Sequence, residues 1–317
     1  MALRIVRSSI NAFLDGYQSF TSIAALLVLP ASASILLSQA LVPFSGPVVK
    51  TISFRLSALF QAARFPAYAE FFALLKVKLA QTVFSFVATL PIVLTFLLVA
   101  KACVVLAVCG GGGRIQRGSP PLSTAFRLYR SILPTHLFNS FLLLSTNASV
   151  FTFMFLVFNV ADVLGLATST ALLLLLSAAG AVLYSVVIAN ATVICNLALV
   201  VAAVDDCGGL LPALKAFLLV RGRASTALGL ALPANLAMAA VEALFQYRVV
   251  RQYDISGELS SSLLWEAFSI AYFHALLLIL EVIMNCKFYE VCTVKIKHEH
   301  ERHQGELELK EKASLFV

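Results

Sequence analysis

The chain has 317 residues, of which 60% are hydrophobic and only 12% are charged, and its formal net charge at pH 7 is +7. An ordinary soluble domain is about 45–50% apolar and about 25% charged. A soluble fold of this length could not hide so much apolar surface, because its outer layer needs polar cover. The composition therefore excludes an ordinary soluble domain and indicates a protein embedded in lipid.

The positive charge is spread over loops and the C-terminal tail. This distribution suits anionic lipid headgroups, so membrane lipids are the first expected partners. The chain has no RNA-binding signature and no separate basic domain, and nucleic acid is not expected as a partner.

Six windows are long and apolar enough to cross a membrane, which needs about 20 residues. They are Phe20–Val42, Val83–Val105, Leu137–Val160, Ala171–Val201, Ser225–Phe245 and Leu263–Met284. The prediction is an all-α, polytopic membrane helical bundle of about six transmembrane helices with additional interfacial amphipathic helices. Residues 1–292 would form this domain, and residues 293–317 a charged cytosolic tail, either disordered or a frayed helix.

The first window has an alternative interpretation as a signal peptide. Ala31-Ser32-Ala33 follows a short apolar run in the manner of a cleavage site. The apolar stretch nevertheless continues to Val42, which is long enough to span. An uncleaved first span is therefore favoured.

The placement of Lys and Arg predicts the orientation, because cytoplasmic loops of membrane proteins are enriched in these residues. With the N-terminus in the cytosol, 16 Lys and Arg fall on the cytosolic side and 7 on the other. Both termini are expected in the cytosol, in the endomembrane system or the plasma membrane. The 42 uncharged residues between Asp162 and Asp205 are predicted to form one long helix, because two spans there would invert this balance.

Three segments between the spans mix apolar residues with scattered cations, as helices lying in the headgroup layer do. They are Leu56–Leu75, Pro121–Ile132 and Leu210–Val220.

Five of the six cysteines lie at or near predicted cytosolic helix ends, and Cys195 lies within a span. A reducing cytosol would keep the five as free thiols. Cysteines beside a membrane are candidates for reversible palmitoylation, and the alternative is that they are small apolar residues at helix ends. The five are Cys103, Cys109, Cys207, Cys286 and Cys292.

A pattern of residues follows the fourth span: an acidic residue, a glycine three positions later, a short amphipathic helix and a Gly-basic pair. Here these are Asp206, Gly209, the helix Leu210–Val220, and Gly222 with Arg223. The pattern resembles a large plant family of six-span membrane proteins of unknown function. The chain is more distantly similar to the membrane domain that accompanies some bacterial glycerophosphodiester phosphodiesterases, whose catalytic domain has no counterpart here. The resemblance implies a membrane location and this fold, and no reaction.

Two further motifs do not predict chemistry. Gly110–Gly113 and Arg114 lack the Gly-Lys-Ser/Thr of a phosphate loop and are interpreted as a linker. The tail residues His298, His300 and His303 are weak metal candidates, and such tracts in charged tails are usually solvated. No metal and no cofactor is expected.

The sharpest candidate site lies in the last span, where Glu266, His274 and Glu281 fall within about 80° of one helix face. Ionisable side chains inside a membrane are costly and normally face a bundle interior or a hydrated cavity. Glu242, near the end of the fifth span, is a candidate partner. These residues either form interhelical hydrogen bonds or line a polar pathway.

The leading hypothesis is a non-enzymatic multi-pass membrane protein that organises membranes or partners through its interfacial helices and cytosolic segments. Its protein partners are unknown, and a homo-oligomer is a further candidate. The alternative is a small-molecule or proton-coupled transporter that uses the polar face of the last span. An enzyme is not expected, because no nucleophile–base or metal constellation is present.

Overall fold

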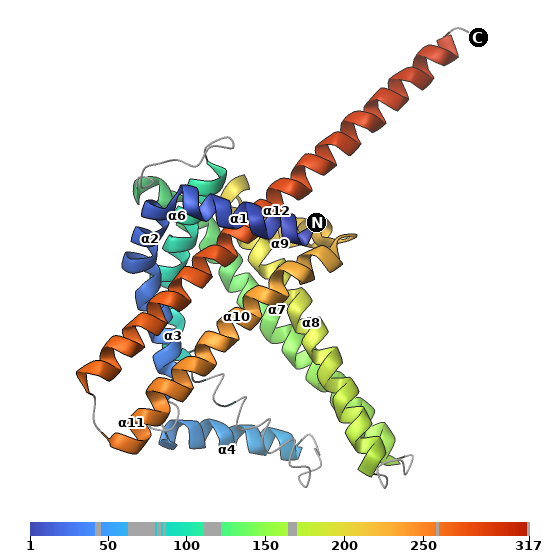
Figure 1. The fold of residues 1–317 in the computed structure, drawn as a ribbon. Helices are drawn as coiled ribbons and strands as arrows, with labels where there is room; N and C mark the ends of the chain where they lie inside the picture. The colour runs from blue at the N-terminus through green and yellow to red at the C-terminus, as the bar shows by residue number, and fades with distance from the viewer. Residues whose placement is uncertain are drawn as a thin grey trace.

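The computed structural model describes residues 1–41, 46–62, 80, 84, 87–110, 122–163, 170–257 and 260–315. Within these ranges the backbone is helical and contains no strand (Figure 1). Six helical stretches are long and apolar enough to cross a membrane: Tyr17–Ser38, Val87–Cys109, Thr124–Ala161, Leu174–Asp205, Ala224–Tyr253 and Ser261–Val294. The all-α fold and the six predicted spans are confirmed, although the third span begins well before its predicted window.

In the described part of the chain, the spans consist of α-helices and short π-helical segments. In chain order these are α2 (Tyr17–Ile23), η1 (Ala24–Val28), α3 (Leu29–Leu41), η2 (Val93–Leu97), α6 (Leu98–Cys109), α7 (Leu122–Val163), α8 (Thr170–Asp205), α10 (Ala224–Phe245), η4 (Gln246–Val250), α11 (Arg251–Ser256) and α12 (Ser261–Leu315). Outside them lie α1 (Ala2–Asp15), α4 (Gly46–Ala62) and α9 (Leu210–Val220). Pro30 lacks an N–H to bond back along the helix, and the wider turn η1 directly precedes it.

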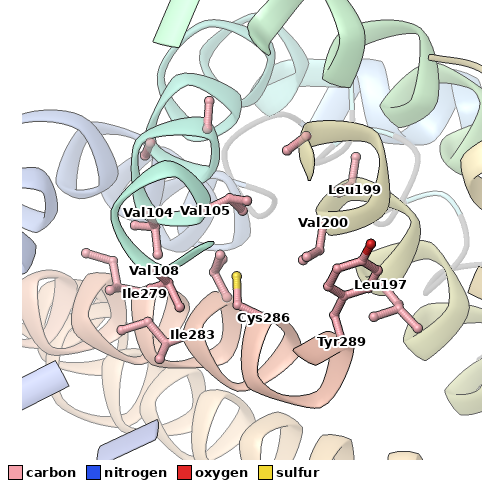
Figure 2. Packing of buried hydrophobic residues seen from close by; sticks show 14 of the residues in the cluster. Val104, Val105, Val108, Leu197, Leu199, Val200, Ile279, Ile283, Cys286 and Tyr289 are labelled. Atoms are coloured by element: carbon pink, nitrogen blue, oxygen red, sulfur yellow. The ribbon is translucent and has the colours of Figure 1, made fainter. Parts of the chain in front are cut away.

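The second span lies at the centre of the bundle. More than half (56%) of its most apolar window is buried, against 6% for the third span. α6 is rich in Ala and Val, and small side chains let helix backbones approach closely in a membrane. Figure 2 shows Val104 and Val108 of α6 beside Ile283 of α12. α6 is therefore the packing centre around which α8 and α12 are placed.

α7 and α8 pack against each other as a long pair that extends away from the other spans (Figure 1). At about 1.5 Å per residue, α7 is about 63 Å long and α8 about 54 Å, roughly twice the thickness of a hydrocarbon core. From Thr170 to Asp205 the uncharged run is one helix, as predicted, and its first residue, Val163, ends α7. The pair is held internally by the Tyr184 hydroxyl, which donates to Asn147 Oδ1 at 2.8 Å.

One predicted interfacial helix is wrong. The segment Pro121–Ile132 was expected to lie apart from the third span, but Leu122–Ile132 forms the first turns of α7. Its apolar residues Ala125 and Leu128 are buried against the bundle, so the helix continues straight into the span. The helix predicted at Leu210–Val220 is confirmed with the same bounds as α9, and its place in the headgroup layer stays a prediction. The helix predicted at Leu56–Leu75 overlaps the end of α4, and its remainder lies outside the described residues.

Both ends of the chain lie at the same end of the bundle, as an even number of spans requires (Figure 1). We call this the termini end. α1 and α9 lie there, whereas α4 and α11 lie at the opposite end (Figure 1). The tail, expected to be disordered or a frayed helix, is the continuation of α12 to Leu315 and projects from the bundle. The side chains of His298, His300 and His303 lie outside the described part of the structure.

Candidate functional site

The polar residues of the last span all lie on α12, but each contacts a different part of the bundle. Glu266 is near the end of the bundle opposite the termini, where its Oε1 lies 2.5 Å from Arg248 Nε of η4. These side chains are 29% and 55% exposed. Such an exposed pair contributes little to stability, and Glu266 lies at the margin of the bundle.

His274 lies deeper and is only 2% exposed. Its Nδ1 is 2.7 Å from the Oγ of Ser32, which is on α3. The Ser32 hydroxyl is also 2.8 Å from the carbonyl oxygen of Ala271, to which it can donate. When Ser32 donates its single proton there, the imidazole donates to Ser32 from Nδ1.

With the proton on Nδ1, the other ring nitrogen of neutral His274 is an acceptor. Its Nε2 makes no hydrogen bond and lies 3.8 Å from Oε1 of Glu242 on α10. A second proton on His274 would turn this contact into an ion pair. His274 thus contacts residues of the first and fifth spans from its place on the sixth, and Glu242 is its contact on the fifth.

Glu281 lies about two helical turns after His274 on α12, towards the termini end. Its Oε1 accepts a hydrogen bond from Asn196 Nδ2 of α8 at 2.8 Å. Lys101 of α6 and Asn285 line the same small cavity as Glu281. Asn196 lines it too, the remaining walls are apolar, and the cavity has room for about one water molecule. Opposite charges inside a span normally pair or share water, as this arrangement allows.

Sequence reasoning missed Lys101 as an intramembrane residue, because it was counted with the cytosolic cations. Its position inside the second apolar window was the available signal. Sequence reasoning also missed Ser32, which was considered only as part of a cleavage site. No local pattern marks it, since its partner His274 is 242 residues away.

The family-like pattern folds α9 back against α7 and α8. Asp206 adopts a left-handed backbone conformation (φ 49°), and Gly209 has φ 88°, which favours glycine. The N–H of Gly209 donates to Thr135 Oγ1 of α7 at 3.0 Å. Gly222 has φ 85° between α9 and α10, and Arg223 is the residue that precedes α10. These residues thus shape the backbone at both ends of α9.

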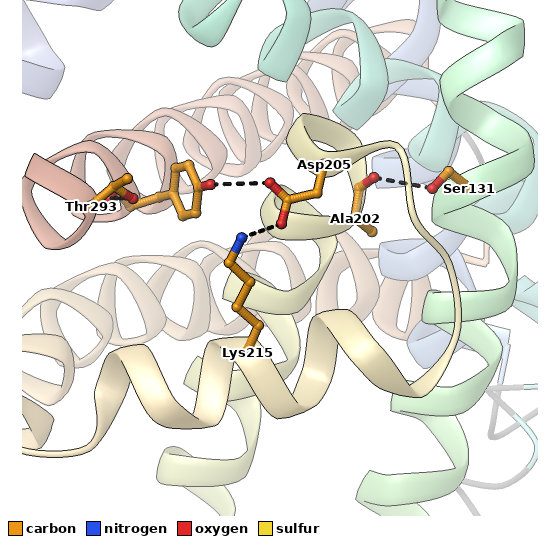
Figure 3. A network of polar contacts seen from close by, with 6 residues as sticks. Ser131, Ala202, Asp205, Lys215 and Thr293 are labelled. Atoms are coloured by element: carbon orange, nitrogen blue, oxygen red, sulfur yellow. Dashed lines mark hydrogen bonds and ion pairs between the residues drawn. The ribbon is translucent and has the colours of Figure 1, made fainter. Parts of the chain in front are cut away.

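The charged contacts at this loop involve the neighbouring residue Asp205, and not Asp206. Figure 3 shows Asp205 between α9 and α12, where its Oδ2 accepts from Lys215 Nζ at 2.5 Å. The hydroxyl of Tyr289 donates to Asp205 Oδ1 at 3.4 Å. The hydrogen bond to Asp205 raises the pKa of Lys215, so Lys215 is charged at neutral pH. Asp205 therefore links α8, α9 and α12 at the termini end.

The five cysteines proposed as palmitoylation sites differ in exposure. All six cysteines of the chain are free thiols in the structure. Cys103, Cys286 and Cys292 are buried, whereas Cys109 and Cys207 are half-buried. Palmitoylation of the five stays a prediction, and Cys109 and Cys207 are the two whose sulfurs an acyltransferase could reach most easily. No cluster of three or more His, Cys, Asp or Glu suited to a metal occurs among the described residues.

Six apolar spans around a buried centre define an integral, multi-pass helical membrane protein. The chain belongs to the family described as Domain of unknown function (DUF8558), whose model matches residues 2–308 and so covers all six spans and α9. No curated protein and no solved structure matches the chain.

Proposed function

We propose that this protein is a non-enzymatic membrane organiser that holds lipids or protein partners at its termini end. In this proposal the termini end faces the cytosol, where α1, α9 and the helical tail offer contact surfaces. The observation that supports this proposal most directly is the placement of the polar residues of α12. Each joins α12 to a different neighbour, and the cavity between Glu281 and Lys101 is about the size of one water molecule.

A membrane organiser needs a bundle that is fixed in shape, and the polar contacts provide this. Within lipid the hydrophobic effect does not drive helices together, so packing and interhelical hydrogen bonds must do so. Ser32 with His274 and Asn196 with Glu281 are two such bonds. Asn139 on α7 adds a third by donating to the carbonyl oxygen of Cys195 on α8 at 2.8 Å.

The experiment replaces Glu281 with Gln, which keeps the shape and the oxygen that accepts from Asn196 but cannot ionise. For an organiser, Glu281→Gln complements a loss-of-function line and melts in detergent within a few degrees of the wild type. His274→Asn is the companion variant, because its amide can still donate near the position of Nδ1. Loss of complementation with an unchanged melting curve in both variants would contradict the organiser proposal.

A second candidate function is a proton-coupled transporter. It is favoured by the amine of Lys101 and the carboxyl of Glu281, which line one cavity inside the membrane, and by the proximity of His274 Nε2 to Glu242. Such pairs can hold and release a proton. Purified protein in liposomes with a trapped pH-sensitive dye separates the two functions. A proton flux that Glu281→Gln abolishes supports the transporter, and no flux supports the organiser.

A further inference from the structure

An open pocket at the termini end is lined by two arginines of α7 and by the loop between α8 and α9. We call it the arginine pocket. Its volume is about 440 Å³, and it is lined by Arg127, Arg130, Ser131, Pro134, Asp206, Gly208 and Gly209. A second pocket of about 220 Å³ shares Arg127 and Asp206 with it and has mostly apolar walls.

Among the described residues, no ion pair involves either of the two arginines. In the part of the chain that the structure describes, Lys215, Arg248 and Lys287 form ion pairs, whereas neither Arg127 nor Arg130 does. Both side chains are exposed. The loop brings the N-terminus of the 11-residue helix α9 to the same pocket, and the dipole of that helix also favours negative charge. Asp206 opposes this with one negative charge, which leaves the pocket net positive.

The surface of α7 below the pocket is apolar. Continuing from Arg127, Arg130 and Pro134, steps of three and four residues reach Leu137, Phe141 and Leu144, so all six lie within about 100° of one helix face. These three apolar side chains are among the exposed large hydrophobics. One stripe of α7 therefore carries cations at its start and lipid-facing apolar residues further along. Along the helix axis, Leu137 lies about 10 Å from Arg130.

We infer that the arginine pocket binds the phosphate of an anionic phospholipid, whose acyl chains lie along Leu137, Phe141 and Leu144. Arginine suits this role, because its planar guanidinium donates in pairs to phosphate oxygens. The apolar stripe favours a lipid over a free phosphate, since a small ion would leave the stripe without a function. The inference names a ligand for the termini end and rests on the proposed function only in placing that end at the headgroup layer.

The experiment uses the full-length protein in a neutral detergent and measures the binding of dioctanoyl phosphatidate by native mass spectrometry. Dioctanoyl phosphatidylcholine is the neutral comparison. Arg127→Gln with Arg130→Gln should weaken phosphatidate binding by about fivefold for each arginine, or roughly 25-fold together. Melting should be unchanged, because neither arginine is buried or paired.

Two further variants make the result specific. Arg4→Gln with Arg7→Gln removes the same charge from exposed positions with the same spacing on α1, and should leave binding unchanged. Asp206→Asn removes the opposing charge, and asparagine tolerates the left-handed backbone at this position. It should strengthen phosphatidate binding by up to about fivefold. A gain of binding cannot result from misfolding, so this variant tests the site even if the arginine variant is unstable.

Three results would overturn the inference. Phosphatidate that binds no more tightly than phosphatidylcholine would exclude an anion site. Equal weakening by the α1 pair and the α7 pair would show attraction to general surface charge only. Competition by glycerol 3-phosphate at the same concentration as the lipid would assign the pocket to a soluble phosphate. None of these results bears on the complementation by Glu281→Gln, so the proposed function and this inference fail separately.

Discussion

Ser32 of the first span and His274 of the last are 242 residues apart in the sequence, and their Oγ and Nδ1 atoms lie 2.7 Å apart. Both side chains are buried. The Ser32 hydroxyl is also 2.8 Å from the carbonyl oxygen of Ala271. One buried hydrogen bond thus joins two distant spans.

Ser32→Ala should destabilise the protein by about 1 kcal/mol, because it leaves Nδ1 of His274 buried without its hydrogen-bond partner. Ser34→Ala is the matched control. The Ser34 hydroxyl bonds only to the carbonyl of Ala31 in its own helix at 2.8 Å, and its loss should have almost no effect. Thermal melting of both variants in the same detergent provides the comparison. Equal melting temperatures for the two variants would contradict a structural role for the Ser32–His274 contact.

Gly208→Ala should be destabilising by about 1–3 kcal/mol, the usual effect of overpacking. A Cβ atom there would lie 2.7 Å from Pro134 Cγ and 2.9 Å from the carbonyl oxygen of Ser131. Gly229→Ala is the control. Gly229 lies inside α10, where alanine is the better helix former, and the added Cβ would lie at an ordinary 3.7 Å from the Cβ of Ala2. In a denaturation experiment, the free energies of unfolding of the two variants should differ by more than about 1 kcal/mol. A Gly208→Ala protein as stable as the wild type would contradict the close packing of the loop against α7.

Cys109 and Cys207 should react with a maleimide in the folded protein, whereas Cys103, Cys286 and Cys292 should react only after denaturation. The reason is that Cys103, Cys286 and Cys292 are buried, so the reagent cannot reach their sulfur atoms in the folded protein. Labelling followed by mass spectrometry of peptides measures each site. In cells, Cys109→Ser with Cys207→Ser should remove any acyl-exchange signal, and a signal that persists unchanged would place acylation elsewhere.

Tags at the two termini should both be cut when protease is added to sealed vesicles with the cytosolic face outward. This follows from the positions of both ends at one end of the bundle and from the 16 to 7 balance of Lys and Arg. A tag inserted beside α11 should be protected, because α11 lies at the opposite end. Protection of either terminal tag would contradict the orientation.

The spans could be predicted because crossing a membrane needs only a local property, an apolar run of about 20 residues. α9 was predicted with its observed bounds, since Asp205 precedes the segment and Arg221 follows it. Two outcomes depended on tertiary packing and were out of reach. Whether Pro121–Ile132 lies flat or continues into α7 is decided by burial against the bundle. The partners of the polar residues of α12 come from distant helices, which no spacing within one span reveals.

α12 is unbroken from Ser261, inside the last span, to Leu315. Beyond Val294 it extends for about 31 Å, at about 1.5 Å per residue. A continuous helix behaves as a lever, so a tilt of about 10° in the last span would move its far end by roughly 5 Å. A change in the tilt of the bundle, such as one caused by a change in bilayer thickness, would therefore displace the end of α12 away from the lipid surface.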